Sequence, residues 1–387
     1  MKKLLAIAVI FALVTGAAFA QFSATLDTRF SIEGNTSSTG DPTIGGSIAD
    51  GYFQGSAAND EGTLGGTVRV KANPQFNSVT DTTDFHRAFI WWRPIDQLKI
   101  FLGKEQDGLF STGGTLTDWA FHRGAEGFTN FHDWDYWRAV FPGNWDTFGL
   151  AISIYPMDGA ELNIVVPTGN SAHPEFYEAR RLPLEDILAY LRVMGSFAIP
   201  DIGTIFFSWI GPQQAFDNIG NNGSQGNLGA SFLLTAIEGL QVQAGISTFL
   251  PKDAASNKPL FVGLAAHYNG DGFGVKFRSA FELGGIANTG SWRLGMANMS
   301  WTTFTKGMAI QFNVMPWFSM DMMDIFCDIG FRMNMPEVGD STNSWHFNPY
   351  VRVPIAGGRF QAGVKVWGAS GSDTINYSIP MGLVFGF

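Results

Sequence analysis

The sequence has little charge and almost no cysteine. Only 15% of its residues are Asp, Glu, Lys or Arg, whereas a soluble domain carries about 25%, so much of the surface is predicted not to face water. The single cysteine, Cys327, excludes an intramolecular disulfide, and we expect it to be an inert packing residue. The formal net charge of −10 argues against a nucleic-acid partner.

Long apolar runs are missing after Gln21. No later stretch reaches the roughly 18 residues of a transmembrane helix, so a helical membrane protein is excluded. The run at 4–14 follows Lys2 and Lys3 and is followed by the small residues around Ala20, a pattern typical of a cleaved secretory signal peptide. We expect residues 1–20 to be removed by cleavage near Ala20/Gln21. Residues 21–387 would then form the mature domain.

The sequence is rich in aromatic residues and glycine, with 35 Phe, 12 Trp, 8 Tyr and 47 Gly. Apolar residues alternate with other residues along several stretches, most clearly at 375–387, where every second residue from Ile375 to Phe387 is apolar. A period of two predicts a β-strand with one apolar face. Because an unpaired apolar strand would aggregate in water, we expect this strand to close a barrel whose apolar face meets lipid.

Further alternating stretches predict strands along the whole mature chain. They lie at 22–30, 52–57, 67–72, 85–92, 98–104, 136–141, 148–155, 191–198, 204–210, 228–236, 240–248, 260–268, 273–282, 292–301, 308–314, 325–334, 345–353 and 360–367, with a short one at 162–166. Very short turns alternate with longer polar loops, as in outer-membrane barrels. The predicted fold is all-β, a transmembrane antiparallel β-barrel with an even number of strands, about 16, with about 18 as the alternative.

Three long loops are predicted at 34–56, 107–133 and 157–187, the last with a short helix at 184–191. Residues 315–324 interrupt the alternation. The segment 107–133 is too long for a tight turn and too irregular for a strand, so it reads as a functional or inward-folded loop.

The polar faces of the strands carry the functional prediction. A charge on the lipid face costs about 2 to 4 kcal/mol near the midplane, so alternation assigns the charged residues to the inside. The candidate pore-lining residues are Arg29, Arg69, Lys71, Arg87, Arg138, Arg192, Lys276, Arg278, Glu282, Asp328, Arg332, Arg352 and Lys365. A barrel of about 16 to 18 strands encloses an aqueous channel.

The inward cations outnumber the inward acids Asp27, Glu282 and Asp328, which predicts a positive lumen and a mild preference for anions. The alternative is that these cations pair with loop carboxylates and only brace the wall. Inward aromatic residues could also form a track for sugars, with Phe89, Trp91, Tyr136, Tyr350 and Trp367 as candidates. We favour the interpretation that these five are interfacial girdle residues.

The early first strand, the long loop after the hairpin at 87–104 and the terminal residues Leu383 to Phe387 resemble a trimeric general diffusion porin of Gram-negative bacteria, or a porin-like barrel of a spirochaete. The resemblance implies an outer-membrane location, homotrimers, and an assembly machinery that reads Phe385 and Phe387. It also implies that loop 107–133 forms the constriction. The candidate constriction residues are Asp118, Trp119, His122, Arg123 and Glu126. The acidic-glycine signature of this loop in enterobacterial porins is absent.

The predicted function is a porin for passive diffusion of small hydrophilic solutes through the outer membrane. An enzyme is disfavoured, because the six histidines are scattered and no nucleophile elbow accompanies them. There is no zinc-type spacing, phosphate-binding glycine loop or EF-hand, so we expect no cofactor and no metal. An adhesin or surface antigen, and a solute-selective channel of the sugar type, remain as alternatives.

Overall fold

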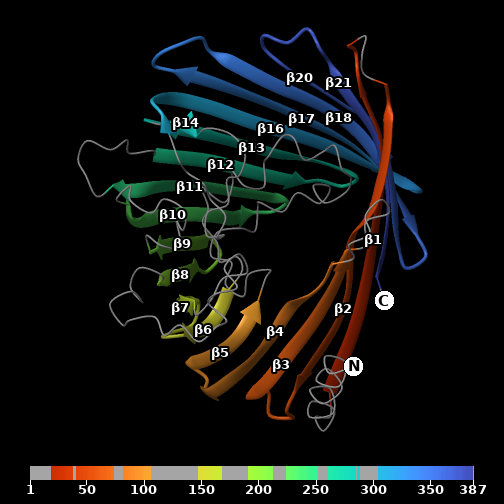
Figure 1. Ribbon diagram of the computed structural model, residues 1–387. Helices are drawn as coiled ribbons and strands as arrows, with labels where there is room; N and C mark the ends of the chain where they lie inside the picture. Colours follow the sequence, from red (N-terminus) through yellow and green to blue (C-terminus); the bar gives the residue numbers. More distant parts are fainter. Residues whose placement is uncertain are drawn as a thin grey trace.

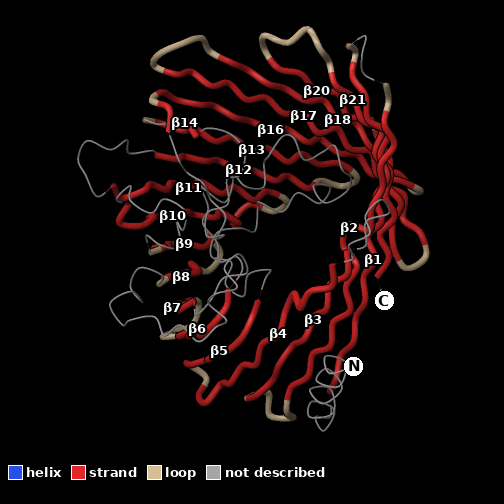
Figure 2. Tube along the Cα trace, in the orientation of Figure 1, coloured by secondary structure: helices blue, strands red, loops and turns tan. Residues whose placement is uncertain are grey.

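The computed structural model describes residues 19–37, 41–73, 82–105, 147–167, 191–211, 224–251, 260–284, 286–287 and 304–386. These ranges form β-strands joined by turns and loops (Figure 2). Within them, no helix is long and apolar enough to cross a membrane. Residues 1–18, which include most of the predicted signal peptide, lie outside the described ranges, so its cleavage stays a prediction.

The strands follow one another along the chain (Figure 1). The first half contains β1 (Phe19–Asn35), β2 (Thr43–Ala58), β3 (Leu64–Asn73), β4 (Thr82–Ile95), β5 (Leu98–Glu105), β6 (Thr147–Ile154), β7 (Ala160–Pro167), β8 (Arg192–Ile199) and β9 (Gly203–Ile210). The second half contains β10 (Ser224–Ile237), β11 (Leu240–Pro251), β12 (Leu260–Asn269), β13 (Phe273–Leu283), β14 (Ile286–Ala287), β15 (Phe304–Thr305), β16 (Gly307–Met320), β17 (Met323–Pro336), β18 (Thr342–Ile355), β19 (Gly358–Gly363), β20 (Lys365–Ala369) and β21 (Asn376–Gly386).

The sheet closes on itself. Each strand pairs antiparallel with the next one along the barrel, and β1 lies beside β21 (Figure 1). In this pairing Leu26 lies opposite Phe385 and Thr28 opposite Leu383. β19 and β20 both pair with β18 on one side and with β21 on the other, and the register does not change from β19 to β20. They therefore form a single barrel strand that is interrupted at Val364. β14 and β15 pair only with each other. The barrel therefore has 18 strands, the larger of the two predicted numbers.

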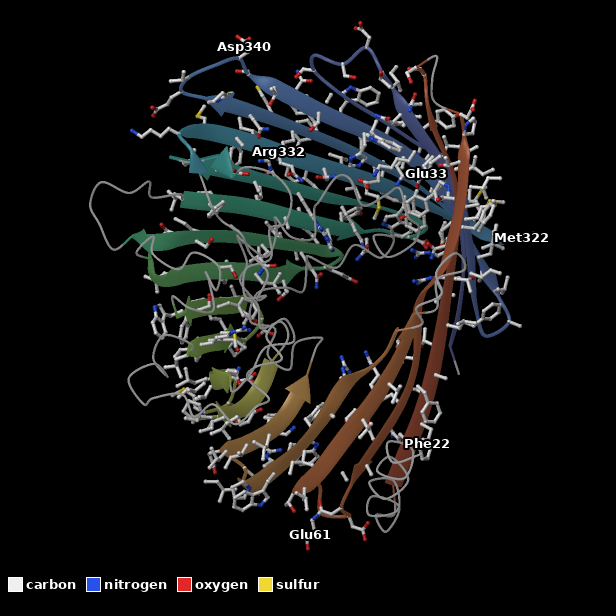
Figure 3. All side chains as sticks on the ribbon, viewed as in Figure 1. Phe22, Glu33, Glu61, Met322, Arg332 and Asp340 are labelled. Carbon is white, nitrogen blue, oxygen red and sulfur yellow. The ribbon has the colours of Figure 1, made fainter. Side chains whose placement is uncertain are left out.

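Short and long connections lie at opposite ends of the barrel. The short turns are 59–63, 96–97, 155–159, 200–202, 238–239, 270–272, 321–322 and 356–357, and the first residues of β1 and the last of β21 lie at this same end. Most connections at the other end are longer, although 337–341 has the same length as 59–63. In Figure 3, Met322 and Asp340 mark the two ends of β17. Outer-membrane barrels have short periplasmic turns and longer external loops, and this barrel has the same difference between its two ends.

The two faces of the sheet differ in the way expected for a protein in lipid. Large apolar side chains such as Phe312 and Phe318 in β16 and Phe347 in β18 are exposed. At the alternate positions polar side chains such as Gln311 and Asn313 are buried. This is the reverse of a soluble protein, in which apolar residues are inside. The exposed face is therefore the lipid-facing outside of the barrel, and the polar face is its inner wall.

Two of the predicted loops are wrong in their bounds. Residues 34–56 belong largely to β1 and β2, because β2 pairs on both edges, with β1 and with β3. The two neighbours provide hydrogen-bond partners for the backbone N–H and C=O groups of β2, although its Gly, Ser and Asp content suggested a loop. Residues 157–187 begin with a turn and then enter β7, which pairs with β6 and β8 and confirms the short strand predicted at 162–166. Residues 168–190, with the predicted helix, lie outside the described part of the chain.

The predicted interruption at 315–324 is also wrong. β16 continues to Met320 and a tight turn at 321–322 leads into β17. The strand runs through Pro316, although proline cannot donate a backbone hydrogen bond within a sheet. The ladder between β16 and β17 has no pair at residue 316, but the ladder to β13 continues there, with Val275 opposite Pro316. The strands predicted at 136–141 and 292–301 lie outside the described residues.

Candidate functional site

The inner wall collects most of the predicted pore-lining residues on one face of the sheet. The register places Arg69, Arg87, Arg192, Lys276, Arg278, Glu282, Asp328, Arg332, Arg352 and Lys365 at inward positions. The backbone positions of Asp27, Arg29 and Lys71 are also among the inward positions of their strands. Arg138 lies outside the described residues.

A polar network runs along the inner wall from β13 to β17. Arg332 Nη2 lies 2.9 Å from Glu282 Oε1, and this ion pair joins a glutamate side chain that is 0% exposed to an arginine that is 16% exposed. Arg332 Nε donates to Asn334 Oδ1 at 2.9 Å, and Nη1 donates to Gln311 Oε1 at 3.4 Å. Figure 3 labels Arg332 on β17. The buried carboxylate fixes the guanidinium, whose remaining exposure faces the lumen.

A histidine and an aspartate also contact each other on the same wall, between β17 and β18. His346 Nε2 is 3.2 Å from Asp328 Oδ2, and both side chains are buried. Gly330, which lies directly opposite His346, provides the room. A Cβ added at Gly330 would lie 2.2 Å from His346 Cε1 and 2.7 Å from Asn313 Nδ2. The imidazole therefore occupies space over a glycine and extends toward β16.

An aromatic cluster lies nearer the short-turn end of the same wall. The rings of Phe326 and Tyr350 stack at 4.7 Å with an interplanar angle of 5°. Tyr350 Oη donates to Met315 Sδ at 3.3 Å, and the Arg352 guanidinium lies 4.7 Å from the centre of the Phe326 ring. Phe326 and Tyr350 are 7% and 2% exposed, so neither offers a free ring face to a passing solute.

A second aromatic group lies on β4 and β5. Phe89 and Trp91 pack against the buried Phe101, and Lys99 Nζ lies 4.4 Å from the ring centre of Trp91. This places Phe89 and Trp91 on the inner face, because Ile90 and Trp92 between and beside them are exposed on the lipid side. Phe89 and Trp91 remain only partly buried.

The preferred girdle interpretation is therefore wrong for Phe89, Trp91, Tyr350 and Trp367. Girdle residues lie on the lipid face, but Trp367 pairs directly with the inward His346 and has Lys365 Nζ 5.3 Å from its ring centre. Composition suggested a girdle, but only the register tells which face an aromatic side chain occupies. The fifth candidate, Tyr136, lies outside the described residues.

Two arginines face each other on β3 and β4. Arg69 and Arg87 are direct register partners. Arg69 Nε donates to Gln54 Oε1 at 2.8 Å, and Arg87 Nη1 donates to the same oxygen at 3.4 Å. The Arg69 guanidinium also lies 4.1 Å from the ring centre of Tyr52. One neutral amide thus bridges two guanidinium groups on neighbouring strands, and like charges in this position oppose folding.

The inner face also carries charges that the sequence analysis did not name. The acids Glu33, Glu161 and Asp324 and the cations Lys99 and Arg359 occupy inward positions. The sequence analysis would have found these five residues if the alternation of inward and outward positions had been continued to the ends of each strand. These residues add two cations and three acids to the inner face. In the turn at 155–159, burial and then Glu161 raise the pKa of Tyr155 above its ordinary value of 10.0, so its hydroxyl is neutral at physiological pH.

Several other predicted site residues cannot be placed. Asp118, Trp119, His122, Arg123 and Glu126 of the candidate constriction loop, and the terminal Phe387, lie outside the described residues. Phe385 lies in β21, opposite Leu26 of β1 and Gly358 of β19. In the part of the chain that is described, no three His, Cys, Asp or Glu side chains gather in a way that could hold a metal ion.

No protein-family model and no curated protein matches the sequence. Solved structures do match. OccAB4 of Acinetobacter baumannii is 8% identical with a TM-score of 0.62, over 96% of this chain and 98% of that one. The outer membrane protein opdK of Pseudomonas aeruginosa is 8% identical with a TM-score of 0.60, over 95% and 98%. OprD of Pseudomonas aeruginosa is 10% identical with a TM-score of 0.56, over 96% of each.

At these identities the likeness is one of fold. It extends over nearly the whole length of both chains. The closed antiparallel β-barrel fold is shared with these outer-membrane proteins, and the fold class predicted from the sequence is confirmed.

Proposed function

We propose that this chain forms a water-filled channel for the passive diffusion of small hydrophilic solutes across the outer membrane. The observation that carries the proposal is a closed barrel of 18 strands with a charged inner wall. About eight strands make a barrel that side chains can fill, whereas 16 to 18 strands leave an aqueous channel. The fold shared with outer-membrane proteins supports the same function.

The size limit of the channel tests this function. Vesicles containing the protein are expected to swell in iso-osmotic solutions of small neutral sugars, at rates that fall smoothly as the sugar becomes larger. Vesicles that contain the folded barrel but do not swell would contradict the proposal. They would favour a barrel that serves mainly as an adhesin or surface antigen.

The proposal includes a mild preference for anions. Arg69 and Arg87 support it, because two half-buried guanidinium groups lie side by side although this arrangement opposes folding. Partly buried charges are screened less by salt than exposed ones. Their field therefore raises the local concentration of anions in the lumen.

Replacing both arginines, in Arg69→Gln/Arg87→Gln, is expected to lower the chloride-to-potassium permeability ratio by about two-fold, because both charges are partly screened. The measurement is the reversal potential of planar bilayers in a KCl gradient. Lys306→Gln, which removes an exposed cation before β16, serves as the control and should leave the ratio unchanged. A cation-selective native channel would refute the preference.

A solute-selective channel is the second candidate. Phe89 and Trp91 support it, because both are inward and only partly buried, with Lys99 beside Trp91. Such a channel would show conductance that one sugar blocks in a saturable manner, whereas a general diffusion channel would not.

Association of three copies, which the resemblance implies, is part of the proposal and is measured by the mass of the detergent-solubilised protein.

A further inference from the structure

Two prolines flank the point at which the strand formed by β19 and β20 is interrupted. On one side, Pro349 of β18 lies opposite Val364, whose backbone N–H donates to the Pro349 carbonyl oxygen at 3.0 Å. On the other side, the common register of β19 and β20 with β21 aligns Gly363 with Pro380. Proline has no backbone N–H and is rare in the middle of a sheet for that reason. This part of the wall therefore has a proline on each of its two edges.

Each of the two prolines removes one hydrogen bond between strands. Pro349 accepts from Val364 but cannot donate in return, so the Val364 carbonyl oxygen lacks the donor that the ladder would provide. Because hydrogen-bonded and non-hydrogen-bonded pairs alternate along a ladder, Val364 bonds toward β18 and Gly363 toward β21, where Pro380 cannot donate either. Neither ladder has a pair at residue 364. A carbonyl group without a donor in the wall of a membrane barrel costs free energy.

β20 is a short segment on the long-loop side of this gap. It has five residues, and it pairs with β18 through residues 366–369 and with β21 through residues 365–367. Residues 370–375 then connect it to β21 (Figure 2). β20 is thus bounded by missing hydrogen bonds at one end and by a loop at the other, so few hydrogen bonds hold it in the sheet.

The neighbouring ladders are complete at the same height. β17 and β18 pair without a gap from Asp324 to Asn334, and β21 pairs with β1 through Pro380, which lies opposite Ser31. Residues 329–332 of β17 lie at the height of β20, because both segments pair with residues 344–347 of β18. The weakness is therefore confined to the two edges of β20 and is not shared by the neighbouring strands.

β20 also contributes side chains to the inner wall. Lys365 and Trp367 occupy inward positions, and Trp367 lies opposite His346 of β18. Lys365 Nζ lies 5.3 Å from the centre of the Trp367 ring, so the two side chains belong to one contact. Any movement of β20 relative to its neighbours therefore changes the inner wall as well as the sheet.

We propose that β20 opens from β18 and β21 as a unit while the rest of the barrel stays closed. Folded proteins open locally where few hydrogen bonds hold the backbone, and Pro349 and Pro380 create such a place at both edges of one segment. The opening moves Lys365 and Trp367 on the inner wall. This inference concerns the wall itself and goes beyond the proposed channel function.

Hydrogen–deuterium exchange of the protein folded in lipid vesicles, followed by mass spectrometry, tests the inference. The backbone amides of β20 are expected to exchange faster than those of residues 329–332. Pro349→Val supplies an N–H that can donate to the Val364 carbonyl oxygen, and valine suits a strand. This variant is expected to slow the exchange of β20 by about five-fold, the effect of one restored hydrogen bond. Pro380→Val should slow it to a similar extent.

Pro316→Val is the matched control. Pro316 also interrupts a ladder, between β16 and β17, but neither of these strands pairs with β20, so the exchange of β20 should stay native. Equal slowing by Pro316→Val would show a general stabilisation of the barrel and would overturn the inference. The same holds for native β20 amides that exchange as slowly as residues 329–332, and for folded Pro349→Val and Pro380→Val variants that exchange like the native protein.

Should both of these variants fail to fold, the comparison of the two native segments decides the point. The outcome does not depend on conduction. A folded barrel without conductance would overturn the proposed function and leave this test unaffected.

Discussion

The variant Phe277→Lys is expected to lose about 2 to 4 kcal/mol of unfolding free energy. Phe277 lies in the middle of β13 on the outer face, between the inward residues Lys276 and Arg278. A lysine there places an ammonium group in the hydrocarbon, where neither water nor a carboxylate can solvate it. The measurement is guanidinium chloride unfolding of the protein folded into lipid vesicles, followed by tryptophan fluorescence.

The neighbouring position provides the control. Lys276→Gln removes a charge from the inner face, and its cost should stay within about 1 kcal/mol, as for ion pairs in contact with water. The exchange variant Lys276→Phe/Phe277→Lys keeps the amino-acid composition and reverses the two faces. It should be at least as unstable as Phe277→Lys. Equal stability of the exchange variant and the native protein would show that the two faces meet the same surroundings.

The variant Glu282→Gln is expected to lose about 3 kcal/mol, near the lower end of the range for breaking a buried ion pair. The lower end applies because Arg332 keeps 16% of its side-chain surface exposed and can be partly solvated from the lumen. The loss arises chiefly from the unpaired guanidinium that remains in the wall. The same unfolding titration in vesicles measures it.

A double-mutant cycle isolates this pair. Glu282→Gln/Arg332→Gln removes both charges and should recover most of the stability that Glu282→Gln loses, since no uncompensated charge remains. The coupling energy of the cycle then measures the interaction. If the losses of the two single variants simply add in the double variant, the pair contributes nothing and the wall is held by other contacts.

Alternation along single strands could be read from the sequence because lipid excludes charge. In β13 the sequence alone placed Lys276, Arg278 and Glu282 on one face, and the register agrees. In β21 it placed the terminal apolar residues on the opposite face to Asn376 and Ser378, and the pairing with β1 agrees. Each of these assignments needs only neighbouring residues and the penalty for a charge in hydrocarbon.

Pairing between distant segments could not be read in this way. β2 has a loop-like composition and becomes a strand because β1 and β3 hydrogen-bond to both of its edges. The alternation fails at 315–324, but β16 continues through Pro316 because the ladder to β13 continues there. The number of strands in the barrel is fixed only when β1 pairs with β21, where Leu26 lies opposite Phe385. The residues of a single strand do not indicate this pairing.

On the inner wall, too, the sequence predicted which face a residue occupies but not which residues meet. Alternation indicated that Glu282 and Arg332 face inward, but their meeting depends on how β13, β16 and β17 are staggered. The space that His346 occupies depends on Gly330 lying directly opposite it. The face occupied by Phe89 and Trp91 was misjudged, because aromatic residues suit both a membrane girdle and a packed inner wall.

Single-channel conductance in planar lipid bilayers tests most directly whether this barrel encloses water. The protein, purified in detergent and verified as folded, should produce discrete conductance steps whose size rises with the KCl concentration, because ions then cross through solvent inside the cylinder. A folded, inserted protein that leaves the bilayer without any conductance would show that the cylinder is closed, and the account would be contradicted.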